Sequence, residues 1–229
     1  MSEKAGTREF GGGPLAKISA LVYTLLVTEG LFLLTTAPAL VLLLLLDRSS
    51  SNLPLDALCL VPVGPAASAV LFALRRRQSD LADLTPAKSF WRGYKLNAVG
   101  ALKVFIPWLL VMTMVSMTLA HRSAGHLPGW WVALLFGIAL VATLWLVNAL
   151  VITSLFAFRT VDVARLATWF LGRTPMVAIG NAGLLVIAAL VTAYGTEALM
   201  ALLVSVLCIA LLGNSAKMIV LVKKDFIAS

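Results

Sequence analysis

Long apolar stretches alternate with short polar segments along the whole chain of 229 residues. A helix of about 20 apolar residues is long enough to cross the roughly 30 Å hydrocarbon core of a bilayer. Windows of this kind predict six membrane-spanning helices, at residues 18–46, 55–74, 99–119, 130–158, 175–193 and 197–222. We therefore expect an all-α polytopic membrane protein, with one transmembrane domain at residues 18–222 between short tails at residues 1–17 and 223–229.

The second predicted span is interrupted by Pro62, Gly64 and Pro65. Proline removes a backbone hydrogen bond, and membrane helices tolerate this where neighbours satisfy the freed carbonyls, so a kinked or broken helix fits the pattern as well as a straight one. Ala66 and Ala69 follow, and small residues let another helix approach closely. Two interpretations stay open: the motif packs helices together, or its break lines a cavity or binds a ligand, as in transporters.

Composition and charge support the membrane class and predict an orientation. The chain is 61% hydrophobic and 12% charged, against about 45–50% and 25% in soluble domains. Its net charge is +8, and of the Lys and Arg residues that lie outside the six spans, all but Arg48 and Arg122 fall on one side. The positive-inside rule then predicts that both termini lie in the cytoplasm. No nucleic-acid partner is expected, because no stacking or groove-reading module accompanies the basic residues.

A basic and aromatic segment follows the second span and is expected to form a short helix in the cytoplasmic interface of the membrane. Its rings share one face of a helix and its charges flank them: Phe90, Trp91 and Tyr94, with Lys88, Arg92 and Lys95. Rings in such a helix face the lipid headgroups or the bundle, and charges face water and anionic lipid. The later loop shows the pattern less strongly, with Leu166, Trp169 and Phe170 on one side.

The same two regions suggest an internal repeat. The stretch 72–75 (FALR) resembles 156–159 (FAFR), and Asn97-Ala98 recurs as Asn181-Ala182 at the same offset of 84 residues. A parallel repeat of a helical hairpin would produce this pattern, and so would chance recurrence of common residues.

Glu29 is the residue that most needs an explanation, because it lies near the middle of the first predicted span. A charge at that depth costs at least roughly 2.5–3.5 kcal/mol. Asn148, Asn214 and Lys217 lie at comparable predicted depths and could hydrogen-bond or pair with it. Glu29 could lock helix packing, couple transport to a proton or substrate, or contact another subunit.

The sequence lacks the common motifs for catalysis, metals and cofactors. The chain has no phosphate-binding loop, no His-Glu-x-x-His and no plausible serine, histidine and acid set. His121 and His126 offer only two metal ligands, which favours exposed histidines over a metal site. Cys59 and Cys208 lie at different predicted depths, so no disulfide is expected. We expect neither an enzyme nor a bound metal or cofactor.

Two stretches, VPVGPAASAVLFALR at 61–75 and SFWRGYKLN at 89–97, resemble the YesL-like family of bacterial membrane proteins, a domain of unknown function. Genes of that family commonly lie beside carbohydrate transporters. The resemblance implies an accessory or regulatory role in carbohydrate uptake, with subunits of a carbohydrate ABC transporter as partners beside membrane lipid. The chain departs from the family at Glu29, where Asn is frequent, and in a longer first outer loop at 47–56.

The alternative is a small autonomous transporter or channel with Glu29 as its coupling residue. Neither long cytoplasmic loop carries a Glu-Ala-Ala-type segment for coupling to an ATPase, which argues against an importer permease. Whether the chain forms a homo-oligomer stays open.

Overall fold

The computed structural model describes residues 14–47, 49–79, 85–122, 128–195, 199 and 202–226, and this part of the chain forms helices and no strand. The helices are α1 (Pro14–Leu45), the 3-10 turn η1 (Ser50–Asn52), α2 (Leu53–Leu60), α3 (Val63–Ser79), α4 (Pro86–Ala120), α5 (Gly129–Leu155), α6 (Thr160–Arg173), α7 (Pro175–Tyr194), α9 (Val204–Asn214) and α10 (Ala216–Phe226). Five of the described helical segments are long and apolar enough to cross a membrane, and α9 with α10 makes a sixth if that bent pair is one span. The predicted all-α polytopic membrane fold is confirmed.

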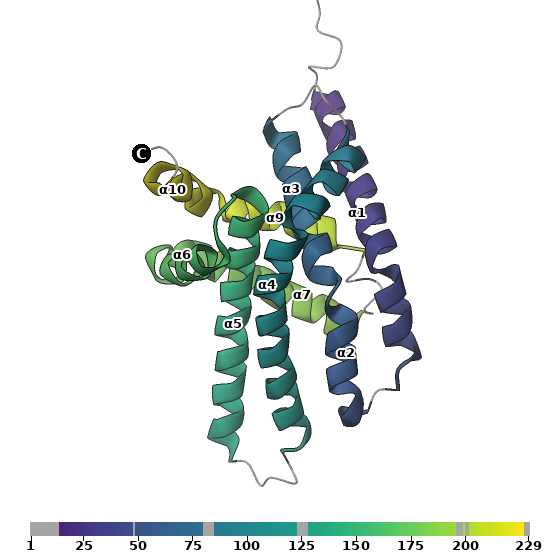
Figure 1. Cartoon of the computed structure of the whole chain (residues 1–229), viewed down its shortest axis with the longest axis vertical. Helices are drawn as coiled ribbons and strands as arrows, with labels where there is room; N and C mark the ends of the chain where they lie inside the picture. The colour runs from purple at the N-terminus through teal and green to yellow at the C-terminus, as the bar shows by residue number, and fades with distance from the viewer. Residues whose placement is uncertain are drawn as a thin grey trace, which may run out of the picture.

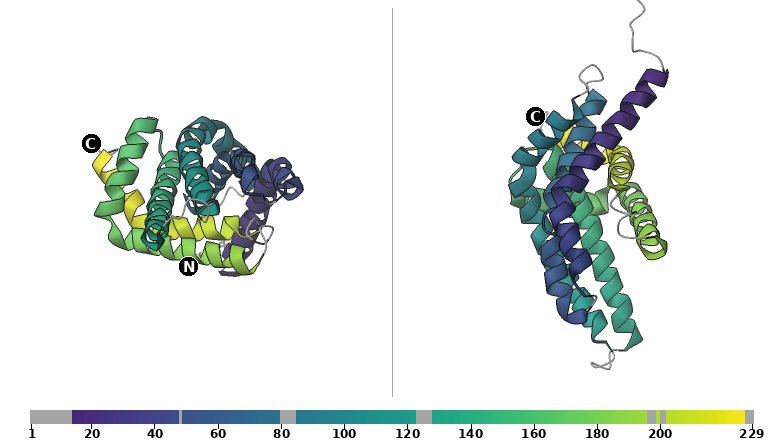
Figure 2. Two further views of the ribbon diagram at one scale, coloured as in Figure 1. Left: turned by 90° about the horizontal axis from the view of Figure 1, so that it is seen from below. Right: turned by 90° about the vertical axis from the view of Figure 1, so that its right-hand side faces the viewer.

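The helices form two groups that differ in direction. Helices α1 to α5 run along the long axis of the molecule, and α3 packs against α1, α4, α5 and α9 (Figure 1). Helices α7 and α9 lie side by side and run across that bundle (Figure 2). The start of α1 and the end of α10 lie toward the same end of the molecule (Figure 1).

Helix α1 places a polar stripe against the bundle. Thr24, Thr28, Phe32 and Thr36 recur every four residues and are all buried. The hydroxyl of Thr28 donates to the carbonyl of Thr24 at 2.8 Å, and that of Thr36 donates to the carbonyl of Phe32 at 2.8 Å. The buried hydroxyls are therefore satisfied within their own helix, which removes the penalty of placing them in an apolar bundle.

The second span is interrupted by a short turn, as its proline and glycine residues allowed, but it continues as one apolar span from Ser50 to Arg76. Helix α2 ends at Leu60 and α3 begins at Val63, with a turn at Val61 and Pro62 between them. The predicted long outer loop at 47–56 is wrong, because η1 and α2 already begin at Ser50 and Leu53. Pro54 lies in the first turn of α2, where a missing N–H costs nothing, and so it starts the helix early.

The prediction of a separate interfacial helix near residue 90 is wrong, because this segment is part of a longer helix. Its residues form the first turns of α4, a continuous helix of 35 residues that begins at Pro86. No glycine or proline stands between Lys95 and Val99 to end the helix, so it continues into the third span. At about 1.5 Å per residue α4 is some 52 Å long, well beyond the hydrocarbon core.

The last predicted span, 197–222, is likewise not one straight helix. Helices α9 and α10 meet at Ser215 and are bent by 55° relative to one another. Gly213, Asn214 and Ser215 are weak helix formers, which explains the break at this point. Glu197, at the start of the predicted span, lies outside the described residues.

Candidate functional site

Glu29 faces the interior of the bundle and is only 7% exposed. Its Oε2 accepts a hydrogen bond of 2.7 Å from the backbone N–H of Ser205, in the first turn of α9. The first N–H groups of a helix have no partner inside the helix and carry partial positive charge, so a carboxyl group is a suitable cap. The other oxygen, Oε1, is buried and has no hydrogen-bond partner among the described residues.

The partners that the sequence suggested for Glu29 lie elsewhere. Lys217 is exposed on α10, beyond the bend. Asn214 ends α9, whereas Ser205, the residue that Glu29 contacts, lies at its beginning. The predicted depths in the membrane assumed that every helix stands upright. Helix α9 instead runs across the bundle (Figure 2), so position along α9 does not correspond to depth in the membrane.

A chain of three asparagines ties α5, α7 and α9 together. The Nδ2 of Asn181 donates to Oδ1 of Asn148 at 3.3 Å, and Nδ2 of Asn214 donates to Oδ1 of Asn181 at 2.7 Å. The Nδ2 of Asn214 also donates to the carbonyl of Val177 at 2.9 Å. Gly180 makes room for this contact, because a Cβ there would overlap the amide of Asn214. We call Asn148, Asn181 and Asn214 the asparagine ladder.

Asn181 entered the sequence analysis only as part of the repeat. Its position inside an apolar span was the signal that singled out Asn148 and Asn214, and it applies equally to Asn181. Lys103 was also missed: it lies inside the predicted third span and is exposed on α4.

A second polar contact joins α3, α4 and α5. The hydroxyls of Ser68 and Ser154 are 2.8 Å apart, and both residues are buried. The Nδ2 of Asn97 donates to the carbonyl of Ser154 at 3.2 Å. The contact therefore joins three helices of the bundle through hydrogen bonds that apolar side chains could not form.

The proline and glycine motif lies where α3 packs on α4. A Cβ added to Gly64 would be 2.6 Å from the ring of Phe105, so only glycine fits there. Ala66 and Ala69 are completely buried, Pro65 is buried and Pro62 is half-buried. This geometry supports the packing interpretation of the motif.

The basic and aromatic residues at the start of α4 separate by burial. Phe90 is completely buried, whereas Trp91 is 42% exposed. The ring centroids of Phe90 and Tyr94 are 6.3 Å apart, and those of Trp91 and Tyr94 are 5.9 Å apart. The three basic side chains of this segment are exposed: Lys88, Arg92 and Lys95.

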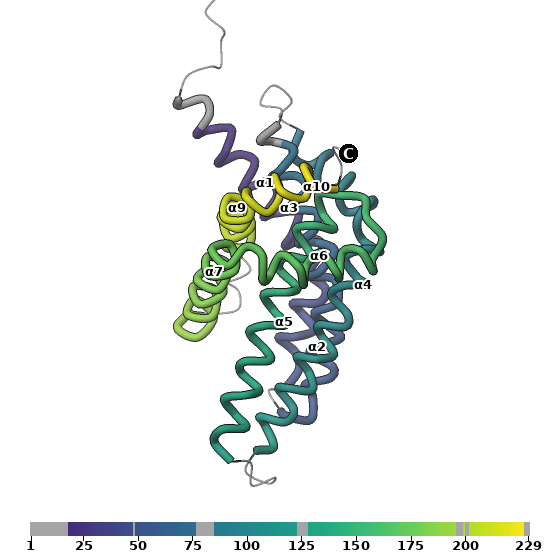
Figure 3. Tube along the Cα trace, turned by 90° about the vertical axis from the view of Figure 1, so that its left-hand side faces the viewer, coloured from purple at the N-terminus to yellow at the C-terminus, as the bar shows by residue number. Residues whose placement is uncertain are grey.

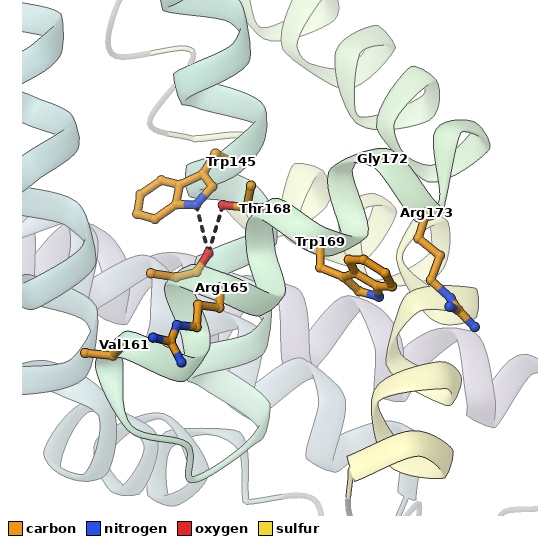
Figure 4. Close-up of a pocket in the computed structure, with 8 residues that line it drawn as sticks. Trp145, Val161, Arg165, Thr168, Trp169, Gly172 and Arg173 are labelled. Atoms are coloured by element: carbon orange, nitrogen blue, oxygen red, sulfur yellow. Dashed lines mark hydrogen bonds between the residues drawn. The ribbon is translucent and has the colours of Figure 1, made fainter.

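Helix α6 and the neighbouring turn of α5 form an open groove of about 920 Å³ (Figure 4). The indole N–H of Trp145 donates to the carbonyl of Ala164 at 3.3 Å, and the hydroxyl of Thr168 donates to the same carbonyl at 3.0 Å. Trp169 was predicted to share a face with Leu166 and Phe170, but it is 57% exposed while both of these are buried. Consecutive side chains of a helix point in different directions, so the indole of Trp169 lies away from the side on which Phe170 is buried and lines the groove.

The remaining candidate ligands do not form a site. Cys59 and Cys208 are free thiols. His121 is exposed and its Nδ1 is 2.9 Å from the carbonyl of Met117, and His126 lies outside the described residues. The described part of the chain holds no group of three or more His, Cys, Asp or Glu residues that could bind a metal.

Comparisons with family models, with curated proteins and with solved structures each found no match. The resemblance to the YesL-like family therefore stays a prediction from residues 61–75 and 89–97.

Proposed function

We propose that this protein is a non-enzymatic accessory or regulatory component of a membrane assembly. One observation carries the proposal: several polar side chains that are buried in the described bundle bond to other helices, namely Glu29, Ser68, Asn148, Ser154 and Asn181. The asparagine ladder joins α5, α7 and α9, Glu29 binds the start of α9, and Ser68 binds Ser154. A protein that conducts a solute needs polar groups that face its path, whereas these groups hold the helices in place.

The proposed setting is the cytoplasmic membrane of a bacterium, with both termini in the cytoplasm. Two observations support this orientation: the excess of Lys and Arg on one side of the spans, and the start of α1 and end of α10 at one end of the molecule (Figure 1). The proposed process is carbohydrate uptake, and the proposed partners are subunits of a carbohydrate ABC transporter. This part rests on the resemblance to the YesL-like family.

A second candidate function is autonomous transport coupled to Glu29. The observation that favours it is Oε1 of Glu29, which is buried without a partner among the described residues and could bind a proton or a cation. The two functions differ in what Glu29→Gln would do, because Gln keeps an oxygen for the Ser205 N–H but cannot exchange a proton at physiological pH.

The test is genetic complementation in the native host. Deletion of the gene should reduce uptake of one sugar from a panel offered as sole carbon source. Both the parent protein and Glu29→Gln should restore that uptake, and affinity purification in mild detergent should recover transporter subunits with each.

Two results would contradict the accessory role. If Glu29→Gln reaches normal levels in the membrane but fails to restore uptake, Glu29 is a coupling residue and the second candidate gains support. If the deletion strain takes up every sugar at the parental rate, the link to carbohydrate uptake is wrong.

A further inference from the structure

The exposed face of α6 carries basic and aromatic side chains at helical spacing. Val161, Arg165, Trp169 and Arg173 follow one another every four residues and all four are exposed. Residues with this spacing lie on one side of an α-helix, and they form the outer wall of the groove between α6 and α5. The inner wall is the indole of Trp145, which its hydrogen bond to Ala164 holds against α6 (Figure 4).

The lining of the groove combines apolar walls with two guanidinium groups. Trp145, Val161, Ala164 and Trp169 supply the apolar surface. Arg165 and Arg173 lie two helical turns apart, about 12 Å along the axis, with Trp169 between them (Figure 4).

These residue types select the chemistry of a ligand. Guanidinium groups bind phosphate through paired hydrogen bonds, and they stack on aromatic rings without losing this ability. The long, flexible stems of Arg165 and Arg173 let both charged groups reach one phosphate placed over Trp169. The complementary ligand is a molecule with a phosphate at one end and a long apolar body.

The position of α6 indicates where such a ligand would come from. Helix α6 connects the end of α5 to the start of α7, and it lies beside α10 (Figure 3), where Arg173 of α6 is 4.0 Å from Asp225 of α10. Tryptophan and arginine at the ends of membrane helices lie at the level of the lipid headgroups. We propose that this groove binds an anionic phospholipid, with the phosphate at Arg165 and Arg173 and an acyl chain against Trp145 and Val161.

Asp225 on α10 competes with the phosphate for Arg173. Its Oδ2 is 4.0 Å from Nη2 of Arg173, and the two side chains are 36% and 50% exposed. The guanidinium carbon of Arg173 also lies 5.8 Å from the ring centroid of Trp169, so the side chain stays beside the groove. An exposed ion pair of this length is weak, so a phosphate bound by both Arg165 and Arg173 can replace Asp225 as the partner of Arg173.

The experiment uses the full-length protein purified in detergent and measures lipid binding by native mass spectrometry. Phosphatidylglycerol should bind at least about tenfold more tightly than phosphatidylcholine of the same chain length. Arg165→Gln combined with Arg173→Gln should lower the phosphatidylglycerol affinity about tenfold. Asp225→Asn should raise it about twofold, because it releases Arg173 from its competitor.

The control is Lys103→Gln combined with Arg122→Gln, which removes the same charge from exposed positions outside both the groove and the basic and aromatic segment at the start of α4, and should keep the affinity within about twofold. Equal binding of the two lipids would overturn the proposal, and so would an equal loss in the control. Inorganic phosphate should not displace the lipid; if it does so at similar concentrations, the groove is a phosphate site and the acyl chain contributes nothing.

Discussion

Asn181 is the central residue of the asparagine ladder, since it bonds to Asn148 on one side and to Asn214 on the other. Interhelical hydrogen bonds in membrane proteins contribute about 0.6–2 kcal/mol each. Asn181→Ala removes two of them, so we expect a loss of roughly 1–4 kcal/mol. For a chain of this size that corresponds to a fall in Tm of about 2–16 °C, measured by thermal unfolding in detergent.

The matched control for Asn181→Ala is Thr192→Ala on the same helix. The hydroxyl of Thr192 is exposed and donates to the carbonyl of Ala188 one turn earlier, at 2.9 Å, so it joins no second helix. This variant should unfold within about 1–2 °C of the parent protein. If both variants unfold at the same temperature, the ladder does not stabilise the bundle.

Glu29 provides the second prediction at this scale, through its bond to the Ser205 N–H. Glu29→Gln keeps an acceptor oxygen, so its Tm should stay close to that of the parent. Glu29→Leu leaves the N–H of Ser205, a residue only 2% exposed, without a partner, which costs about 1–3 kcal/mol. The Tm of Glu29→Leu should therefore be several degrees below that of Glu29→Gln. An equal Tm for the two variants would show that the hydrogen bond to the Ser205 N–H does not stabilise the fold.

At the scale of the elements, the contact between α3 and α4 depends on glycine. A Cβ on Gly93 would lie 2.8 Å from Cβ of Phe72, an atom that cannot move without its helix. We expect Gly93→Ala to push the two helices apart and to cost about 1–3 kcal/mol in thermal or chemical unfolding.

Gly137 on α5 is the comparison for Gly93, because, apart from its chain neighbours and the backbone of its own helix, no atom of the described residues lies within 4 Å of the position that its Cβ would take. Alanine is the better helix former by up to about 1 kcal/mol, so Gly137→Ala should be neutral or stabilising. The two substitutions are chemically identical and should differ in sign. Stabilisation by both would mean that α3 and α4 do not approach as closely as described.

Apolar length alone predicted where α1, α5 and α7 lie, because these helices contain few interruptions. It failed where a helix continues or bends for local reasons. The segment 86–98 has the composition of an interfacial helix, but no glycine or proline separates Lys95 from Val99, so the segment continues into the rest of α4. The bend at Ser215 depends on weak helix formers inside an apolar window, which hydropathy does not detect.

The same limit applies to the candidate site. An apolar context was enough to single out Glu29, Asn148 and Asn214 as buried polar residues, and the first two are buried as expected. Their partners could not be predicted, because pairing depends on the direction of α7 and α9 across the bundle (Figure 2). The face of Trp169 was missed because this residue lies at the edge of the buried face of α6, about 100° around the helix from Phe170. That buried face is formed by Val163, Leu166, Ala167 and Phe170.

At the scale of the whole molecule, the charge distribution predicts that both termini face the cytoplasm. Ser2→Cys and Ser229→Cys, in a background with Cys59 and Cys208 replaced, should resist a membrane-impermeant thiol reagent in intact cells. Ser50→Cys should react, because Ser50 is exposed in the segment between α1 and α2, which lies at the opposite end of the molecule from the start of α1 (Figure 1). Labelling of either terminus from outside would contradict an even number of crossings with this orientation.

The central claim is that the buried polar residues hold helices together and do not carry a solute. Its most direct test is flux through the purified protein alone, reconstituted in liposomes with a pH-sensitive dye and radiolabelled sugars. We predict that proton and sugar flux equal those of empty liposomes, for the parent protein and for Glu29→Gln alike. Flux above that background that Glu29→Gln abolishes, while the variant keeps the parental Tm, would contradict the claim and identify an autonomous transporter.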